Sequence, residues 1–344
     1  MSRKFLGMAV AGLLLLGGCR KDLCYNHAEH ALTSRMEVLA EWELEWERMM
    51  EGERDWEAAW EAWEDGWFGM EYDDLRPEAG GGLRVCVYTG DDRESEVNLD
   101  STGGTVHVSP GEHNVLLYNN DTEYITFHET DSWATATAST RTRTRTRAGG
   151  TVLEGKTPPD NLFGAYVEGF VAERSDTAKV LPVVMQPLTH TYAIFMRFRG
   201  GTEHIRLARG ALSGMAVSVF LQDGRVSEED GTLLFDEECV VEEGHGVWAL
   251  VRSFGVAGTA NGYYGTKSGV RHVLELEVVL GNGKTKLFEA DVTEQVSGQT
   301  RGGVVYVDEG WEVTDEEAAG GNGGGFDVDI DGWGDYVDVI LPLD

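Results

Sequence analysis

Polar and apolar residues alternate along most of this chain with a period of two, which is typical of β-strands with one buried face. The first alternating run covers residues 36–46, with Met, Val, Ala, Trp and Leu on one side and mostly glutamates on the other. We predict a half-buried strand there, although Glu and Ala favour helices. Later runs are bounded by Gly, Pro, Asn and Asp, and the clearest cover residues 83–88, 114–121, 124–127, 191–198, 272–280 and 286–292. This pattern predicts an all-β protein.

One segment has a helical period instead. Trp56, Trp60, Trp63 and Trp67 recur at a spacing that places them on one face of a helix, with acidic residues between them and glycines at the end. We predict one short Trp-rich helix that covers the open end of a β-sandwich. The alternative is that exposed tryptophans form a stacking platform for carbohydrate, which would make the protein a glycan-binding surface lipoprotein.

The length and the positions of Pro and Gly predict two domains of ordinary size. We place the N-terminal β-sandwich domain at residues 35–187 and the C-terminal one at residues 188–316. Residues 317–344 form a Gly-rich linker followed by alternating runs at 326–331 and 336–341. A strand on a flexible linker can pair with its own sheet or with that of a neighbouring molecule.

The N-terminus has the order of a secretory signal: two basic residues, twelve uncharged and mainly apolar residues (5–16), and then Leu16-Gly17-Gly18-Cys19. This end is similar to the lipobox of bacterial lipoproteins. It predicts a signal peptide at residues 1–18, lipidation of Cys19 by diacylglycerol and acylation of its new amine, and a polar tether at residues 19–34. The alternative is an ordinary signal peptide with a chance cysteine. Three acyl chains are sufficient for stable attachment to a membrane.

Removal of residues 1–18 leaves 26 basic and 60 acidic residues, a net charge of −34. This charge argues against nucleic acid as a partner. Of the remaining cysteines, we expect Cys86 and Cys239 to be small buried apolar residues. Cys24, His27 and His30 are residue types that bind zinc, but no fourth ligand accompanies them, so we predict no metal site there.

Residues 140–147 alternate strictly between Thr and Arg, which places four arginines on one face of a strand. We favour an edge strand that is protected by its charges. Pairing of the arginines with the acidic helix or with a partner subunit is the alternative.

The C-terminal run contains a weak calcium candidate, Asp327, Asp329 and Asp331 followed by Gly332, with Asp338 at the twelfth position. A strand whose aspartates face water explains the same pattern more simply. We find no serine elbow, Cys–His pairing, phosphate loop or dinucleotide motif, and therefore predict a protein that is not an enzyme and uses no cofactor.

Several short blocks occur together in a characteristic order: the lipobox, residues 19–27, the Trp-rich acidic segment, Pro159-Asp-Asn-Leu-Phe-Gly-Ala165, Ala211-Leu-Ser-Gly-Met215 and Asp291-Val-Thr293. With these blocks the chain resembles the fimbrillin-like lipoproteins of Bacteroidetes, in particular a branch near the minor and anchor subunits of their fimbriae. The resemblance implies two transthyretin-like β-sandwich domains in tandem, on a protein attached to the outer membrane and displayed at the cell surface.

The resemblance also implies a role. Structural pilins of this family lose their N-terminal segment by proteolysis at an arginine, and a strand of a neighbour fills the groove. Arg48 or Arg54 is the matching position here. If the segment is kept, the chain is an anchor, accessory or tip subunit in pilus assembly or cell adhesion. The implied partners are other fimbrial subunits and a ligand on a host or bacterial surface.

Overall fold

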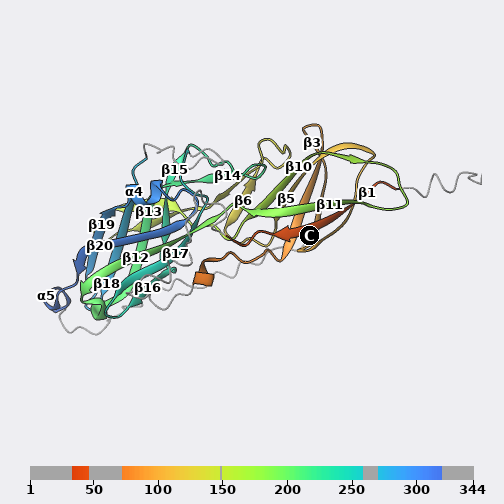
Figure 1. The fold of residues 1–344 in the computed structure, drawn as a ribbon. Helices are drawn as coiled ribbons and strands as arrows, with labels where there is room; N and C mark the ends of the chain where they lie inside the picture. Colours follow the sequence, from red (N-terminus) through yellow and green to blue (C-terminus); the bar gives the residue numbers. More distant parts are fainter. Residues whose placement is uncertain (1–32, 46–71, 148, 259–269, 320–344) are drawn as a thin grey trace, which may run out of the picture.

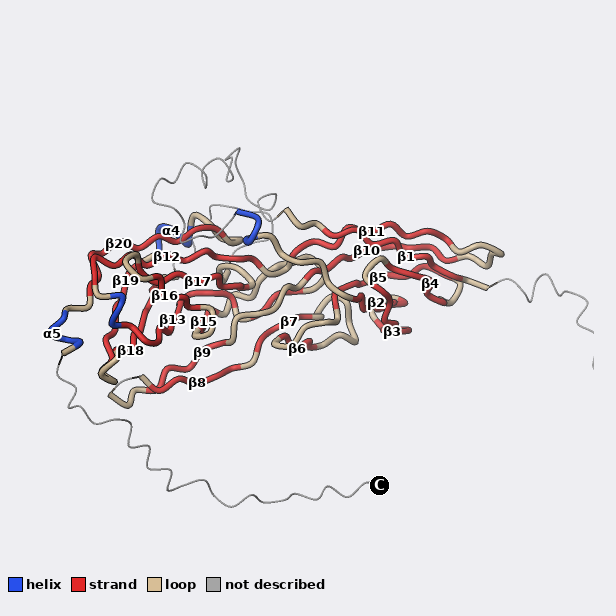
Figure 2. Tube along the Cα trace, turned by 90° about the horizontal axis from the view of Figure 1, so that it is seen from below, coloured by secondary structure: helices blue, strands red, loops and turns tan. Residues whose placement is uncertain are grey.

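The computed structural model describes residues 33–45, 72–147, 149–258 and 270–319. Within these ranges β-strands dominate, and the helices are a few short turns, so the predicted all-β class is confirmed. The strands run roughly along an elongated molecule, with β1, β3 and β4 toward one end and α5 at the other (Figures 1 and 2). No helix among the described residues is long and apolar enough to cross a membrane.

Seven strands from the first half of the chain close into a barrel, in the order β1-β11-β10-β5-β2-β3-β4. They are β1 (Arg35–Trp42), β2 (Gly82–Thr89), β3 (Asp92–Asp100), β4 (Gly103–His107), β5 (Gly111–Asn119), β10 (Phe163–Ala172) and β11 (Lys179–Pro187). The run predicted at 36–46 therefore contains a strand, β1, which ends at Trp42; residues 43–45 lie beyond it. The expected sandwich would have two open sheets. Here β1 pairs antiparallel with β4 on one side and parallel with β11 on the other, and so closes the ring of strands.

A four-stranded sheet with the order β16-β17-β12-β20 and a six-stranded sheet with the order β19-β18-β13-β15-β9-β8 build the other end of the molecule. The first contains β12 (His190–Gly200), β16 (Cys239–Glu242), β17 (Gly246–Ser253) and β20 (Gly303–Glu312). The second contains β8 (Thr142–Thr146), β9 (Val152–Lys156), β13 (Ile205–Ala216), β15 (Asp230–Phe235), β18 (Val273–Leu280) and β19 (Thr285–Asp291). Their facing apolar side chains form one core, which includes Ile194, Phe235 and Leu276.

The remaining elements are small. A three-stranded sheet consists of β14 (Ser218–Phe220), β7 (Thr137–Thr140) and β6 (Ile125–His128). The helical turns are η2 (Tyr72–Leu75), η3 (Thr202–His204), α4 (Thr293–Ser297) and α5 (Asp315–Ala318). η2 packs its Tyr72 and Leu75 on the outer face of the four-stranded sheet, against Phe195.

Strand pairing crosses the predicted boundary near residue 187. Strand β9 pairs with β15 through Lys156 and Leu233, and β7 pairs with β14 over three residue pairs. The segment from β6 to β9 thus belongs to the first half in sequence but pairs with strands of the second half. The division into residues 35–187 and 188–316 remains a prediction, and any such division must accommodate these pairings.

The arginine-rich run forms β8, an edge strand as predicted, and Arg141 before the strand is exposed, but Arg143, Arg145 and Arg147 turn toward carboxylates of the protein. Arg145 is buried; its guanidinium donates to the carbonyl oxygen of Gly210 and lies 2.7 Å from a carboxylate oxygen of Asp236. Arg143 shares the Asp236 carboxylate at 3.4 Å, and Arg147 pairs with Glu275. These three arginines bind the carboxylates of Asp236, directly after β15, and of Glu275 in β18, whereas the threonines at 142, 144 and 146 are exposed.

Candidate functional site

The site residues predicted from the sequence lie outside the described residues. These are the lipidation site Cys19, the processing sites Arg48 and Arg54, and the calcium candidates Asp327, Asp329, Asp331 and Asp338. The Trp-rich helix, the Cys24 cluster and the alternating runs after residue 326 also lie there. Each of these stays a prediction. What the structure does describe is the strand that directly follows the tether, β1, and its place in the barrel.

Strand β1 contributes its alternate side chains to the barrel core. Met36 and Val38 have no exposed surface, and Ala40 and Trp42 pack against the same cluster. On the opposite face, Leu39 is 48% exposed. The alternation seen in the sequence therefore has its expected meaning, since one face of β1 completes the core and the other faces solvent.

The end of β1 is fixed by contacts to three different parts of the barrel. The Trp42 indole packs edge-on against the ring of Phe163, with centroids 5.0 Å apart. Its Nε1–H donates to the carbonyl oxygen of Ser101 over 2.9 Å. Beyond the strand, the backbone N–H of Glu43 donates to the carbonyl oxygen of Met185. These contacts hold Trp42 and Glu43 against β10 and β11.

The geometry defines what the barrel would be without β1. Five residues of β1 pair with β4, and seven pair with β11. Loss of the strand would leave the facing edges of β4 and β11 unpaired, and would expose the core where Met36 and Val38 lie. Two unpaired edges beside an apolar core can accept an extended segment from another chain. We call the place of β1 between the edges of β4 and β11 the seat of β1. It is the candidate functional site that the described residues define.

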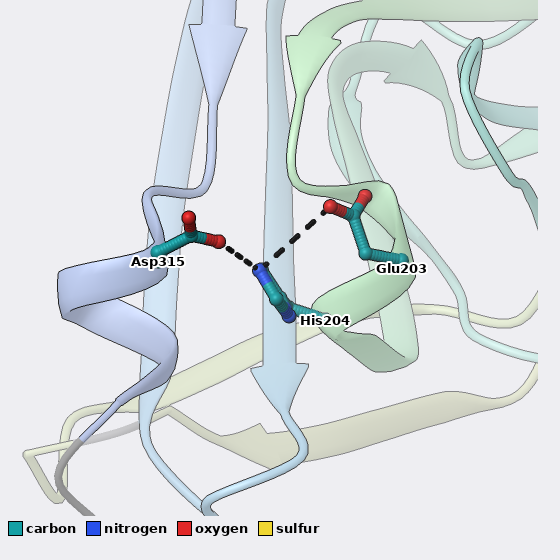
Figure 3. Close-up of side chains that lie close together, drawn as sticks. All are labelled: Glu203, His204 and Asp315. Carbon is teal, nitrogen blue, oxygen red and sulfur yellow. Dashed lines mark hydrogen bonds and ion pairs between the residues drawn. The ribbon is translucent and has the colours of Figure 1, made fainter.

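A second group of side chains has the composition of a metal site. Figure 3 shows Glu203 and His204, from η3, beside Asp315, the first residue of α5. The Nε2 atom of His204 lies 2.9 Å from Asp315 Oδ1 and 3.8 Å from Glu203 Oε1. One imidazole and two carboxylates are ligands that divalent transition metals accept.

The exposure of this cluster favours a structural role. The Asp315 side chain is 96% exposed, and the group offers three ligand atoms. The contact joins η3 to α5, which is further fixed by a capping box between Thr314 and Glu317 and by an ion pair of Glu317 with Lys286 at 2.7 Å. We conclude that His204 and Asp315 hold the C-terminal turn against the sheet. Sequence reasoning missed this pair because 111 residues separate its members.

The two described thiols have no features of nucleophiles. Cys86 is fully buried, as predicted, and burial raises the pKa of its thiol. Cys239 is half-buried, and desolvation raises the pKa of its thiol to about 12. A reactive cysteine requires a depressed pKa, so neither thiol is poised for catalysis.

Known proteins are similar to parts of this chain. Residues 71–236 match the family model described as "Domain of unknown function (DUF5119)". Over 162 residues the chain is 24% identical to the "Putative fimbrium anchoring subunit Fim4B" of Bacteroides ovatus, an alignment that covers 45% of this chain and 47% of that protein. The chain thus spans about half the length of this curated relative.

One solved structure extends the similarity of fold to most of the chain. A "putative adhesin" from Bacteroides ovatus superposes with a TM-score of 0.53 and 18% identity, and the match covers 87% of this chain and 97% of that one. A second "putative adhesin" from the same species gives a TM-score of 0.42 and 10% identity, over 80% and 89% of the two chains. The first of these shows a shared fold. Together with the sequence similarity to a fimbrium anchoring subunit, it bears out the predicted resemblance to the fimbrillin-like proteins of Bacteroidetes.

Proposed function

We propose that this protein is a surface lipoprotein that acts as a fimbrial anchor or accessory subunit, or as a tip subunit, in pilus assembly or cell adhesion. Cys19 carries the lipid and holds the protein in the outer membrane, with its barrel and sheets at the cell surface. Other fimbrial subunits bind it by β-strand addition. The protein is not an enzyme. The similarity to a fimbrium anchoring subunit and to adhesins supports this proposal.

The observation that carries the proposal is the position of β1. This strand begins at Arg35, 16 residues after Cys19, and is built into the barrel core between β4 and β11. A pull on the lipid is transmitted through the short tether into the ladders of β1, seven residue pairs with β11 and five with β4, and into the buried side chains of Met36 and Val38. An anchor requires such a connection, since its load passes between the membrane and the filament.

Proteolysis at Arg48 or Arg54 would change this role. It would separate β1 from the rest of the chain and allow the strand to leave, so that the barrel becomes an acceptor for a neighbour's strand. The lipid would then serve only for export. We favour retention of β1, because the strand supplies core side chains rather than a peripheral cover.

The mature N-terminus distinguishes the two roles. Surface protein should be isolated from cells, and its N-terminal residue determined by mass spectrometry. Retention predicts a lipidated Cys19, and processing predicts a chain that starts after Arg48 or Arg54. A Cys19→Ala variant should lose outer-membrane attachment in the first case, and a Cys24→Ala variant is the matched control.

Immunogold microscopy of intact cells then tests the fimbrial role. We expect label at the base or tip of filaments, and we expect filaments to detach from cells or to be lost when the protein is deleted. Unchanged filaments in the deletion strain would contradict the proposal. Saturable tryptophan fluorescence changes with polysaccharide, in a strain with normal fimbriae, would support the glycan-binding alternative.

A further inference from the structure

Strands β10 and β11 are neighbours in the barrel but pair over a short distance. Their ladder consists of two residue pairs, Phe163 with Pro187 and Gly164 with Gln186. On its other edge β10 pairs with β5 from Gly164 to Ala172, and β11 pairs with β1 from Lys179 to Met185. Among the described residues, no ladder pair joins residues 165–172 to residues 179–185. We call this opening the β10–β11 gap.

The divergence of the two strands is built into β10. A β-bulge interrupts its pairing with β5 between Val167 and Phe170, and Gly169 within it has a positive φ of 69°. A bulge bends its strand and increases the local twist. At the far end of the gap, the ammonium group of Lys179 donates to the carbonyl oxygen of Val171 over 2.8 Å. The gap is therefore bounded by a ladder at one end and by a single side chain at the other.

An open pocket of about 380 Å³ lies at the ladder end of the gap. Both strands line it, through residues 164–167 of β10 and through Pro182 and Val184 of β11. Residues 221–224, His190 and Arg301 complete the wall. The pocket thus has the backbone of two strands, apolar side chains, one cationic residue, Arg301, and one acidic residue, Asp223.

The surface beside the gap is apolar in an otherwise acidic protein. Nine large hydrophobic residues are exposed among those that the structure describes, and three of them lie on the two strands at the gap, with Leu39 on the adjacent strand β1. Val180 and Val184 are 53% and 48% exposed, and Leu39 and Val171 accompany them. Clustered exposed apolar residues beside unpaired strand edges mark a surface for strand addition.

We infer that the β10–β11 gap is a second strand acceptor, and that its occupant is the alternating segment 326–341 of a second copy of this chain. The inference rests on strand addition in the proposed function, and it names an acceptor that is available while β1 stays in place. The run from Tyr336 to Leu341 has six residues and is short enough to lie along the eight residues 165–172 that have no ladder pair with β11. One face of this run would lie on the buried side chains of Phe170 and Val183, and the other beside Val180 and Val184.

Charge and reach support this occupant. Segment 326–341 contains five aspartates, and Lys179 and Arg301 lie at the two ends of the gap. Residues 320–335 would span at most roughly 55 Å when extended. The described part of the chain ends directly after α5, at the end of the molecule opposite β1 and β4 (Figures 1 and 2). A segment that leaves one end and binds near the other end of the next copy makes a head-to-tail contact.

Self-association of the mature chain without its lipid tests the inference. Analytical ultracentrifugation over a range of concentrations should show association of the wild type. We expect Val180→Asp/Val184→Asp in the gap and Val337→Asp/Val339→Asp in the segment each to weaken it by at least about tenfold. Val152→Asp is the matched control, because Val152 is 61% exposed on β9, away from the gap, and this variant should behave as the wild type.

Hydrogen exchange gives a second measurement on the same samples. Association should protect amides in residues 165–170 and 180–185, and circular dichroism should show that all variants are folded. A wild type that stays monomeric would overturn the inference, as would association that survives in the gap variant or that is equally lost in Val152→Asp. None of these results changes the mature N-terminus or the filament phenotype, so the inference can fail while the proposed function stands.

Discussion

Trp42 and Phe163 meet edge to face, with ring centroids 5.0 Å apart and planes at 85°. The first belongs to the strand that follows the tether, and the second opens β10, 121 residues later in the chain. Gly80 lies against the same indole so closely that a Cβ atom there would come within 2.7 Å of it. The contact joins the first strand of the barrel to β10, a strand far from it in sequence, so the position of β1 depends on long-range contacts.

Trp42→Ala should loosen the end of β1. The substitution removes the contact with Phe163 and the hydrogen bond to Ser101, and leaves a cavity. Because Trp42 is half-buried, we expect a loss of about 2–4 kcal/mol in the free energy of unfolding, at or below the range for a fully buried aromatic residue. Urea unfolding measures it. Leu39→Ala, on the exposed face of the same strand, should change stability by less than about 0.5 kcal/mol, and an equal loss in both variants would contradict this account.

Gly103→Ala should disturb the pairing of β1 with β4. Gly103 has a φ of 106° and faces Leu39 in the register, and a Cβ there would lie 2.1 Å from the carbonyl oxygen of Val38. Relief of this clash requires β1 to move, so we expect a loss of more than about 2 kcal/mol and faster hydrogen exchange in residues 36–40.

Gly90→Ala separates the clash from the backbone strain. Gly90 also has a positive φ, but a Cβ there meets no atom within 4 Å. This variant should lose only about 1 kcal/mol, with unchanged exchange in β1. If Gly103→Ala is no worse than Gly90→Ala, the close approach of Gly103 to β1 has no energetic consequence.

The alternating pattern was sufficient to predict the strands but not their partners. Met36 and Val38 are buried as their period of two predicts, and residues 191–198 lie within β12. The parallel pairing of β1 with β11 is invisible in the sequence, because a period of two specifies which face is buried and not which strand lies alongside. The same limit explains why the crossing of β9 to β15 was missed.

Charge was the least predictable property of the fold. The alternation of Thr and Arg correctly predicted that the arginines of β8 share one face of the strand. It does not indicate whether that face contacts water or carboxylates of the protein. The partners Asp236 and Glu275 lie 91 and 128 residues away from the arginines that they bind. The candidate site residues predicted from local motifs fall outside the described residues, whereas the seat of β1 arises from pairings that no local motif encodes.

Asp236→Ala should weaken the attachment of the hairpin formed by β8 and β9. The variant leaves the buried guanidinium of Arg145 without its carboxylate, and Arg143 loses the same partner. An unpaired buried charge is costly, so we expect a loss of roughly 2–3 kcal/mol and faster trypsin cleavage at residues 141–147.

Asp131→Ala is the control for this prediction. Asp131 pairs with Arg93 at 2.7 Å, but its side chain is 89% exposed. Exposed ion pairs contribute less than about 1 kcal/mol, so stability and trypsin sensitivity should stay close to those of the wild type. Similar losses in the two variants would show that burial of Arg145 does not determine the strength of its pair.

The motif Asp291-Val-Thr293 predicts a measurable acid dependence. The Asp291 carboxylate accepts hydrogen bonds from the Thr293 hydroxyl at 2.6 Å, from Arg271 at 2.9 Å and from the Thr293 backbone N–H at 3.1 Å. The Thr293 hydroxyl, followed by Arg271, lowers the pKa of Asp291 from 3.8 to about 2. Because the folded state favours the carboxylate, its contribution to stability is fully present above pH 3.8 and is lost as the pH falls toward 2.

Urea midpoints of the wild type and of Asp291→Asn, measured from pH 5 down to pH 2, test this dependence. The difference between the two proteins should be largest at pH 5 and should shrink between pH 3.8 and 2. Thr293→Ala removes the main donor, so the pKa of Asp291 should rise and the remaining difference should disappear at a higher pH. A difference that stays constant from pH 5 to pH 2 would mean that the motif acts through the geometry of the turn before α4 rather than through the charge of Asp291.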